Sequence, residues 1–214
     1  MTIEKKHVFF RRVSTAGQEL TLQQEADLRY REALTENQIL IIDETSAQKG
    51  LDLDYLIFLT LSYTGMRAGE LVALKWKDID FDEHTISITK TYYNPTNNTL
   101  EYQLVTRKSK RTIVVDKEVI AALKKHMLVQ KKVQEHFGEA YLDEGFIFAK
   151  KEKQPGYPIF VKTVENRMAR LLKLAGLNSE LTPHSLRHAH TSLLAEAKVG
   201  LEELGGDYGS VRTL

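Results

Sequence analysis

The sequence predicts an α+β fold: a mainly helical body with a small antiparallel three-stranded sheet, preceded by one βαβ unit. Three observations lead to this prediction. Apolar and amphipathic stretches of helical length dominate from residue 51 onward. Short runs rich in β-branched residues, separated by turn signals, lie between residues 85 and 115. Before residue 50, two short apolar runs flank one amphipathic stretch. We therefore expect an N-terminal unit at 1–49, a main domain at 50–204 and a flexible tail at 205–214.

Composition narrows the class of protein. With 214 residues, of which 42% are hydrophobic, the chain can bury one core and a small second unit. No stretch approaches the roughly 20 apolar residues of a membrane span, and the first residues lack a signal-peptide core, so we expect a cytoplasmic protein. The absence of cysteine excludes disulfides and cysteine-ligated zinc. A net charge of +1 says nothing about partners, because a nucleic-acid binder needs only a basic face.

The first 50 residues predict a strand at 7–13, a helix at 19–34 and a second strand at 38–43. Arg12 and Ser14 would point to the same side of the first strand, near the end where α/β sheets commonly bind ligands. The stretch from Arg12 to Gln18 resembles the start of the serine recombinases, up to about residue 48. That resemblance implies a nucleophilic Ser14 and a phosphate-binding Arg12. We expect no activity from Ser14, because one βαβ unit cannot surround a phosphate with donors.

From residue 51 an apolar run predicts a buried helix that ends at Gly65, and a second helix opens near Met66. Arg67 and Glu70 are spaced i, i+3 on that second helix, with Leu71 and Leu74 continuing the same face. A buried arginine needs an acidic partner or a bound anion. The spacing alone leaves both alternatives open: a structural ion pair with Glu70, or an anion site that Glu70 orients.

The sheet and the later helices follow in order. We expect a turn at 80–84, strands at 85–91, 102–105 and 112–115, a hairpin loop at 94–98, and a basic turn at 107–111. We further expect a helix at 116–133, an extended apolar segment at 145–148, a basic loop at 150–158, a helix at 163–175, and a last helix capped by Thr182 with Pro183 first. On that last helix His184, Arg187 and His188 form a donor cluster near the N-terminus, where the helix dipole favours an anion.

The motifs T-G-x-R-x-x-E-L at 64–71 and H-x-L-R-H at 184–188 together resemble the tyrosine recombinase (phage integrase) family over about residues 51–203. The resemblance implies that Arg67, His184 and Arg187 hold the scissile DNA phosphate, with Glu70 and His188 in support. The family also uses a lysine on the sheet. Val105 aligns with that lysine, so Lys108 in the neighbouring basic run is the best substitute. We expect the other basic residues of this run to contact DNA: Arg107, Lys110 and Arg111.

The tail departs from the family pattern. Gly206 stands where a histidine or tryptophan usually follows Leu-Gly, and Tyr208 comes earlier than the family's nucleophilic tyrosine, within a Gly-rich segment. We therefore expect the chain to stop before the nucleophile. The spacing of His184 and His188, with His190 nearby, also fits a zinc pair, but no HExxH glutamate lies between them. We expect no metal and no cofactor.

These features predict a site-specific recombinase or integrase-like protein of a mobile element. It would bind double-stranded DNA and other recombinase protomers, without a membrane partner, and would cleave DNA weakly or not at all. A non-enzymatic DNA-binding protein, including a fragment that interferes with an intact recombinase, is the alternative. A fragment without function is the third possibility.

Overall fold

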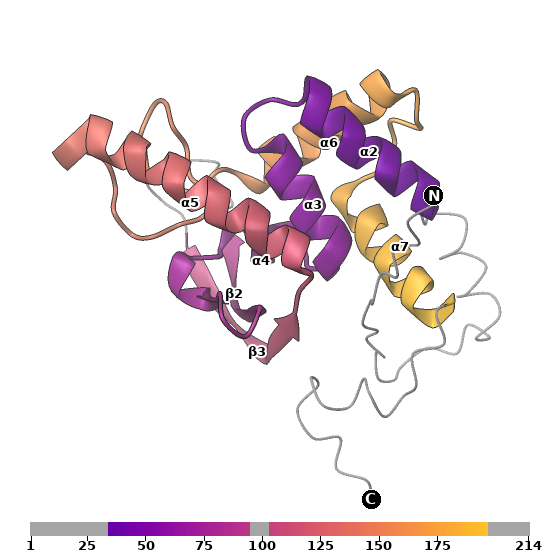
Figure 1. Ribbon diagram of the computed structural model, residues 1–214, viewed down its shortest axis with the longest axis horizontal. Coiled ribbons are helices and arrows are strands. Elements are labelled where there is room, and N and C mark those ends of the chain that lie inside the picture. Colours follow the sequence, from indigo (N-terminus) through magenta and orange to yellow (C-terminus); the bar gives the residue numbers. More distant parts are fainter. Residues whose placement is uncertain (1–33, 95–102, 197–214) are drawn as a thin grey trace, which may run out of the picture.

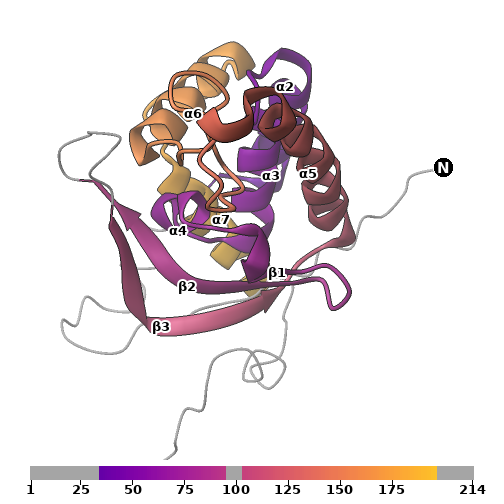
Figure 2. The same ribbon diagram turned by 90° about the vertical axis from the view of Figure 1, so that its left-hand side faces the viewer.

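Helices build most of the fold, and one antiparallel sheet lies along one side of them (Figures 1 and 2). The computed structural model describes residues 34–94 and 103–196, except for the side chains of 106–109, 192 and 194–196. In order, the elements are α2 Glu36–Lys49, α3 Asp54–Thr64, α4 Ala68–Val72, η1 Trp76–Asp78, β1 Ile79–Asp80, β2 Thr85–Tyr93, β3 Gln103–Val114, α5 Lys117–Phe137, η3 Gly138–Ala140, α6 Val161–Ala175 and α7 Pro183–Glu196. The predicted mainly helical fold with a small antiparallel sheet is confirmed.

Helix α3 forms the centre of the helical layer. It contacts α2, α4, α5 and α7, and Figure 1 shows it between α2, α5 and α7. Its sequence is apolar on every face, as expected of a helix that is buried all round. Gly65 ends the helix with a left-handed φ of 56°, and its N–H donates to Leu61 O at 3.0 Å. The predicted buried helix and its glycine stop are both confirmed.

The sheet has the order β1-β2-β3, with antiparallel pairing throughout. Ile86 and Ile88 of β2 are buried, and Figure 2 shows the helices gathered over one face of the sheet. The predicted strand at 85–91 is therefore confirmed, as is the turn before it. The hairpin loop predicted at 94–98 falls largely outside the described residues.

The strand predicted at 38–43 is wrong, because these residues belong to helix α2. Thr35 and Gln38 form a capping box: Gln38 N donates to Thr35 Oγ1 at 3.3 Å, and Thr35 N donates to Gln38 Oε1 at 2.9 Å. Ile39 and Ile42 are buried at helical spacing. The cap and the helical period outweigh the β-propensity of the Ile-Leu-Ile-Ile run. Because α2 packs on α3, α6 and α7, it belongs to the same folded body as the later helices.

The two separate strands predicted at 102–105 and 112–115 are one strand, β3. Arg111 pairs with Ile88, whereas Thr106 pairs with Lys90. Between these two pairs the chain advances five residues along β3 but only two along β2. An irregularity in β3 accommodates the three extra residues. The basic run contains no Gly, Pro or Asn that would favour a turn, so the chain continues in the strand.

The remaining helices agree closely with the prediction. Asp116 caps α5 by accepting a hydrogen bond from Glu118 N at 2.7 Å, and α6 ends at Gly176. Pro183 opens α7 as predicted. The helix predicted after Met66 is shorter than expected, since α4 ends at Val72 and Leu74 lies beyond it. The segment at 145–148 is largely buried, as its apolar sequence predicts, but its backbone bends after a single bridge between Phe146 and Lys75.

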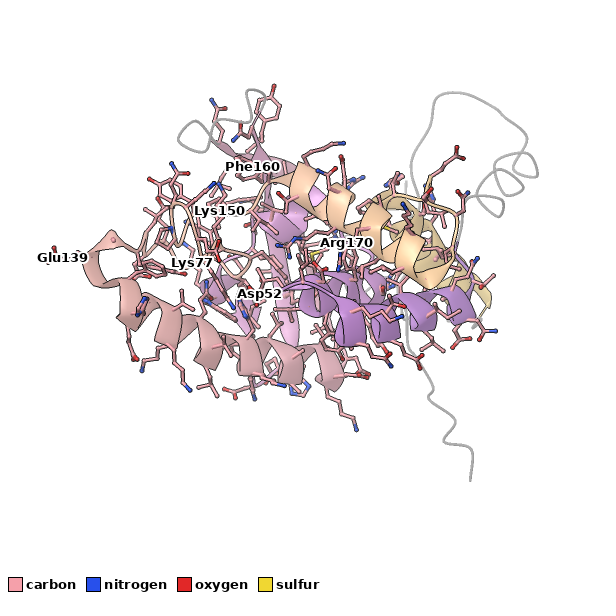
Figure 3. The ribbon with its side chains drawn as sticks, turned by 90° about the horizontal axis from the view of Figure 1, so that it is seen from above. Asp52, Lys77, Glu139, Lys150, Phe160 and Arg170 are labelled. Atoms are coloured by element: carbon pink, nitrogen blue, oxygen red, sulfur yellow. The ribbon has the colours of Figure 1, made fainter. Side chains whose placement is uncertain are left out.

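A buried carboxylate fastens the loop between α2 and α3 to α6. Asp54 Oδ2 accepts a hydrogen bond from Leu51 N at 2.8 Å, and Asp54 Oδ1 accepts one from Arg167 Nη1 at 2.9 Å. Arg170 adds a longer ion pair at 3.7 Å and donates to Lys49 O at 3.1 Å. Figure 3 shows Asp52 in this loop and Arg170 on the neighbouring α6. This staple fixes α3 at its N-terminal end.

In the part of the chain that the structure describes, no helix is both long and apolar enough to cross a membrane.

Candidate phosphate-binding site

Arg67 stands at the N-cap of α4, and Glu70 on the first turn holds it in two places. Arg67 Nη1 donates to Glu70 Oε1 at 3.3 Å, and the Arg67 backbone N–H donates to Glu70 Oε2 at 3.0 Å. Glu70 is completely buried, whereas the Arg67 side chain remains 34% exposed. The ion pair predicted from the i, i+3 spacing is present, and it leaves part of the guanidinium open to solvent.

Arg111 of β3 engages the same carboxylate from the sheet. Its Nη2 donates to Glu70 Oε2 at 2.7 Å, and its Nη1 donates to Glu70 Oε1 at 3.3 Å. Only 9% of the Arg111 side chain is exposed. The sequence placed Arg111 in a basic turn facing DNA, but its guanidinium lies buried against α4.

Arg187 of α7 reaches the turn between α3 and α4. Its Nη1 donates a short hydrogen bond to the backbone carbonyl of Gly65, two residues before Arg67. The tertiary structure thus brings Arg187 close to the Arg67 segment, although the two arginines are far apart in the sequence. A carbonyl holds a guanidinium without neutralising it, so the positive charge of Arg187 is retained.

His190 lies directly behind this contact. Its Nδ1 is 3.1 Å from Ser62 O, and because a carbonyl only accepts, Nδ1 must carry the proton. The pKa of His190 is lowered to about 4, chiefly because burial disfavours the charged ring; the Ser62 hydrogen bond opposes this effect, and the positive charge of Arg187 adds to it. His190 is therefore neutral at pH 7 and serves as a packing and hydrogen-bonding residue.

His184 and His188 form an edge-to-face ring pair on the first turns of α7, with centroids 4.4 Å apart. His190 contacts the α3 backbone, so the three histidines do not converge. Among the described residues, no group of three or more histidine, aspartate or glutamate side chains could hold a metal ion. His184 is exposed on the same helix turn as Arg187, where it can donate to an anion.

Val105, which the sequence resemblance aligns with the family's lysine, is exposed on β3. Val105 is 44% exposed and pairs with Thr91 of β2. A Cβ added to Gly69 of α4 would lie 2.7 Å from Thr91 Oγ1, so this pair sits close to the Arg67 helix. The side chains of Arg107 and Lys108 are outside the described residues, while Lys110 is exposed on β3.

Several predicted residues cannot be placed. Two parts of the prediction lie wholly or almost wholly outside the described residues. They are the strand and helix at 7–34, with Arg12 and Ser14, and the tail, with Gly206 and Tyr208. The resemblance of residues 7–48 to serine recombinases has no support from the fold, because the last part of that segment is helical.

Sequence reasoning missed two roles within this cluster. Arg111 was grouped with its basic neighbours, although the alternation of β3 was a usable signal: Arg111 and the buried Ile113 share one face of the strand. His190 was weighed only as a zinc ligand. Its position one helical turn beyond the buried Leu186 was the available sign that it faces the core.

Together these contacts gather positive charge around the turn between α3 and α4. Arg67 and Arg111 share the Glu70 carboxylate, and Arg187 binds the nearby Gly65 carbonyl, so three guanidiniums and one carboxylate leave this region positively charged. The N-terminus of α7 adds its dipole. Arginines whose positions are fixed before binding are suited to a phosphate, because little ordering is left to occur when the anion arrives.

Comparisons with known proteins name the family to which this fold belongs. Residues 32–205 match the model of the phage integrase family. The chain is 37% identical over 144 residues to an integrase of Staphylococcus phage L54a, covering 66% of this chain and 40% of that protein. It is 30% identical over 168 residues to the ICEBs1 integrase of Bacillus subtilis, covering 73% and 42% respectively. The chain belongs to the phage integrase (tyrosine recombinase) family.

Solved structures agree. The Tn1549 transposon integrase, in complex with a circular intermediate DNA, has a TM-score of 0.65 and 25% identity, covering 81% of this chain and 56% of that chain. XerA recombinase shares the fold with a TM-score of 0.61. The chain spans less than half the length of the two integrases compared above.

Proposed function

We propose that this chain is the phosphate-gripping part of a site-specific recombinase of a mobile element. Its substrate is double-stranded DNA, and Arg67, Arg187 and His184 bind the phosphate at which strands are exchanged. Other recombinase protomers are its protein partners.

One observation carries the proposal: Arg187 is fastened to the carbonyl of Gly65, beside the Arg67–Glu70 pair. A core helix does not require an arginine at this point, and burying a guanidinium costs free energy unless it is compensated. An oxyanion bound by Arg67 and Arg187, with His184 one turn before Arg187 on α7, would explain why an arginine is held at this turn.

The chemistry follows from the charges. Guanidinium donors aimed at the non-bridging oxygens stabilise the extra negative charge of a phosphoryl transition state more than that of the ground state. His184 adds a donor at the N-terminus of α7. His188 and Glu70 support these groups from neighbouring positions.

The site lacks a lysine at the position where the family has the acid that protonates the leaving oxygen. Val105 stands where the family has its lysine, so we propose that Lys108 takes this task and that the chain by itself cleaves DNA weakly. Tyr208 follows Arg187 at a shorter separation in the sequence than the family's nucleophile does, which also favours weak cleavage. An exposed valine at the lysine position also favours the second candidate function, a DNA-binding protein that occupies recombination sites without cutting them.

A salt titration tests DNA as the substrate. Binding of a fluorescent 30-base-pair duplex is measured by anisotropy between 50 and 200 mM NaCl. If the chain neutralises several phosphates, affinity falls by orders of magnitude over this range. Affinity that stays flat removes DNA as the partner.

A nicked suicide duplex separates the two candidate functions. A covalent protein–DNA adduct on denaturing gels identifies a recombinase, whereas salt-dependent binding without an adduct identifies the non-cutting binder. The Arg187→Ala variant is the control, since it must abolish any adduct that arises from this site.

A further inference from the structure

The Glu70 carboxylate accepts hydrogen bonds from two arginines. Its Oε1 accepts Arg67 Nη1 and Arg111 Nη1, both at 3.3 Å. Its Oε2 accepts the Arg67 backbone N–H at 3.0 Å and Arg111 Nη2 at 2.7 Å. Arg111 therefore binds the carboxylate with two parallel donors, the strongest geometry available to this pair.

Burial makes Arg111 the main partner of the carboxylate. Glu70 is fully buried, and a buried carboxylate is strongly unfavourable unless a charge compensates it. Arg67 is a third exposed, so water screens part of its charge. Arg111, nearly as buried as Glu70, is not screened in this way. Arg111 thus holds Glu70, and Glu70 holds Arg67.

Arg111 also connects Glu70 and Arg67 to the β2–β3 hairpin. Arg111 pairs with Ile88 immediately before the register shift, and Thr106 pairs with Lys90 beyond it. The part of the hairpin that contains Val105 and the basic run therefore begins at Arg111. One carboxylate joins the base of this hairpin to the Arg67 turn.

We propose that Arg111 is a positioning residue and not a DNA contact. It acts through Glu70 to fix the Arg67 guanidinium for a phosphate, and it sets the base of the β2–β3 hairpin against the same site. The inference rests on the proposed function for the phosphate, while the Arg111–Glu70–Arg67 relay itself can be tested without DNA.

Side-chain NMR of the ¹⁵N-arginine-labelled full chain tests the relay. Guanidiniums held by a carboxylate rotate slowly and give separate Nη signals, and Arg67→Lys identifies those of Arg67. We expect Arg111→Lys to remove the Arg111 signals and to merge the Arg67 signals into a fast-rotating average. Arg170→Ala, which removes a half-exposed arginine bound to a different carboxylate, should leave them unchanged.

A double variant keeps the test valid if Arg111→Lys unfolds. Arg111→Met with Glu70→Gln removes both buried charges at similar volume, so the fold should survive with a Tm close to that of the wild type. The Arg67 signals should still merge, because the carboxylate that holds them is gone. Separate Arg67 signals in either folded variant overturn the proposal.

DNA binding distinguishes positioning from direct contact. If Arg111 touched a phosphate, its removal would reduce the slope of log affinity against log salt by about 1. We expect an unchanged slope and a three- to tenfold loss of affinity in the Arg111→Met, Glu70→Gln double variant, compared with a reduced slope in Lys110→Ala. A slope reduced by about 1 in the double variant overturns positioning. Salt-independent binding by the wild type overturns only the proposed function, and the NMR result then decides the relay alone.

Discussion

His190 packs so closely on Gly65 that the space between them cannot hold a methyl group. A Cβ at residue 65 would lie 2.4 Å from His190 Cδ2 and 2.9 Å from Cγ. The same glycine carries the carbonyl that binds Arg187. Two residues of helix α7 therefore contact the α3–α4 turn at Gly65: the His190 ring packs against it, and Arg187 donates a hydrogen bond to its carbonyl.

Replacing Gly65 with alanine should destabilise the protein by about 2–4 kcal/mol. The left-handed φ of 56° costs a residue with a Cβ about 1–2 kcal/mol, and overpacking against a buried ring adds a similar amount. Urea unfolding followed by circular dichroism measures the change.

Gly176→Ala is the matched control for this variant. Its φ of 70° is also left-handed, but nothing lies within 4 Å of the added Cβ. It should therefore show the backbone cost alone, about 1–2 kcal/mol. Equal losses in the two variants would show that the His190 contact has no energetic importance.

His190 should make the protein less stable in mild acid. Its folded pKa, about 4, lies below the ordinary value of 6.5, so between these pH values the unfolded chain binds a proton that the folded chain excludes. The contribution of neutral His190 to the free energy of unfolding is complete above pH 6.5, and it falls by about 3 kcal/mol as the pH drops to 4. Unfolding free energies measured across this range test the slope.

His190→Asn supplies the comparison, because an amide nitrogen can still donate to Ser62 O but does not titrate. In this variant the free energy of unfolding should decline much less below pH 6.5 than in the wild type. The part due to His126 should remain, since burial lowers the pKa of that histidine as well. An identical pH profile in variant and wild type would contradict the assignment to His190.

Removing the Asp54 staple should cost about 3 kcal/mol. Asp54→Ala leaves Leu51 N without its acceptor and Arg167 without its buried partner. Glu165→Ala, which breaks the exposed Lys162–Glu165 pair, should change stability by less than about 1 kcal/mol. A small effect in Asp54→Ala would show that the loop after α2 does not depend on α6.

The phosphate arginines should matter more for cleavage than for binding. Arg67→Ala or Arg187→Ala should abolish any adduct on the nicked duplex while weakening DNA binding only several-fold, because such donors act mainly on the transition state. Lys162→Ala serves as a surface-charge control. A loss of binding as large as the loss of cleavage would mean that these arginines are ordinary ground-state contacts.

Local signals in the sequence determined most of the helices and part of the site. Helix starts and stops act within one turn of the chain, so the sequence predicts them without knowledge of the tertiary structure. The examples here are Gly65, Gly176, the cap at Asp116 and Pro183 at the start of α7. The i, i+3 spacing of Arg67 and Glu70 is local in the same sense. Two motifs far apart in the sequence indicated the family through their resemblance to known recombinases.

Tertiary structure alone decided what depends on contacts between distant segments. Packing on α3, α6 and α7 buries one side of the helix at 38–43, which the capping box of Thr35 and Gln38 begins. The basic run became part of a strand because β2 pairs with it. Arg111 and His190 acquired their roles from partners on other elements, Glu70 and Ser62. The free energy of a buried charge or ring depends on what surrounds it in space, and that environment exists only once the chain has folded.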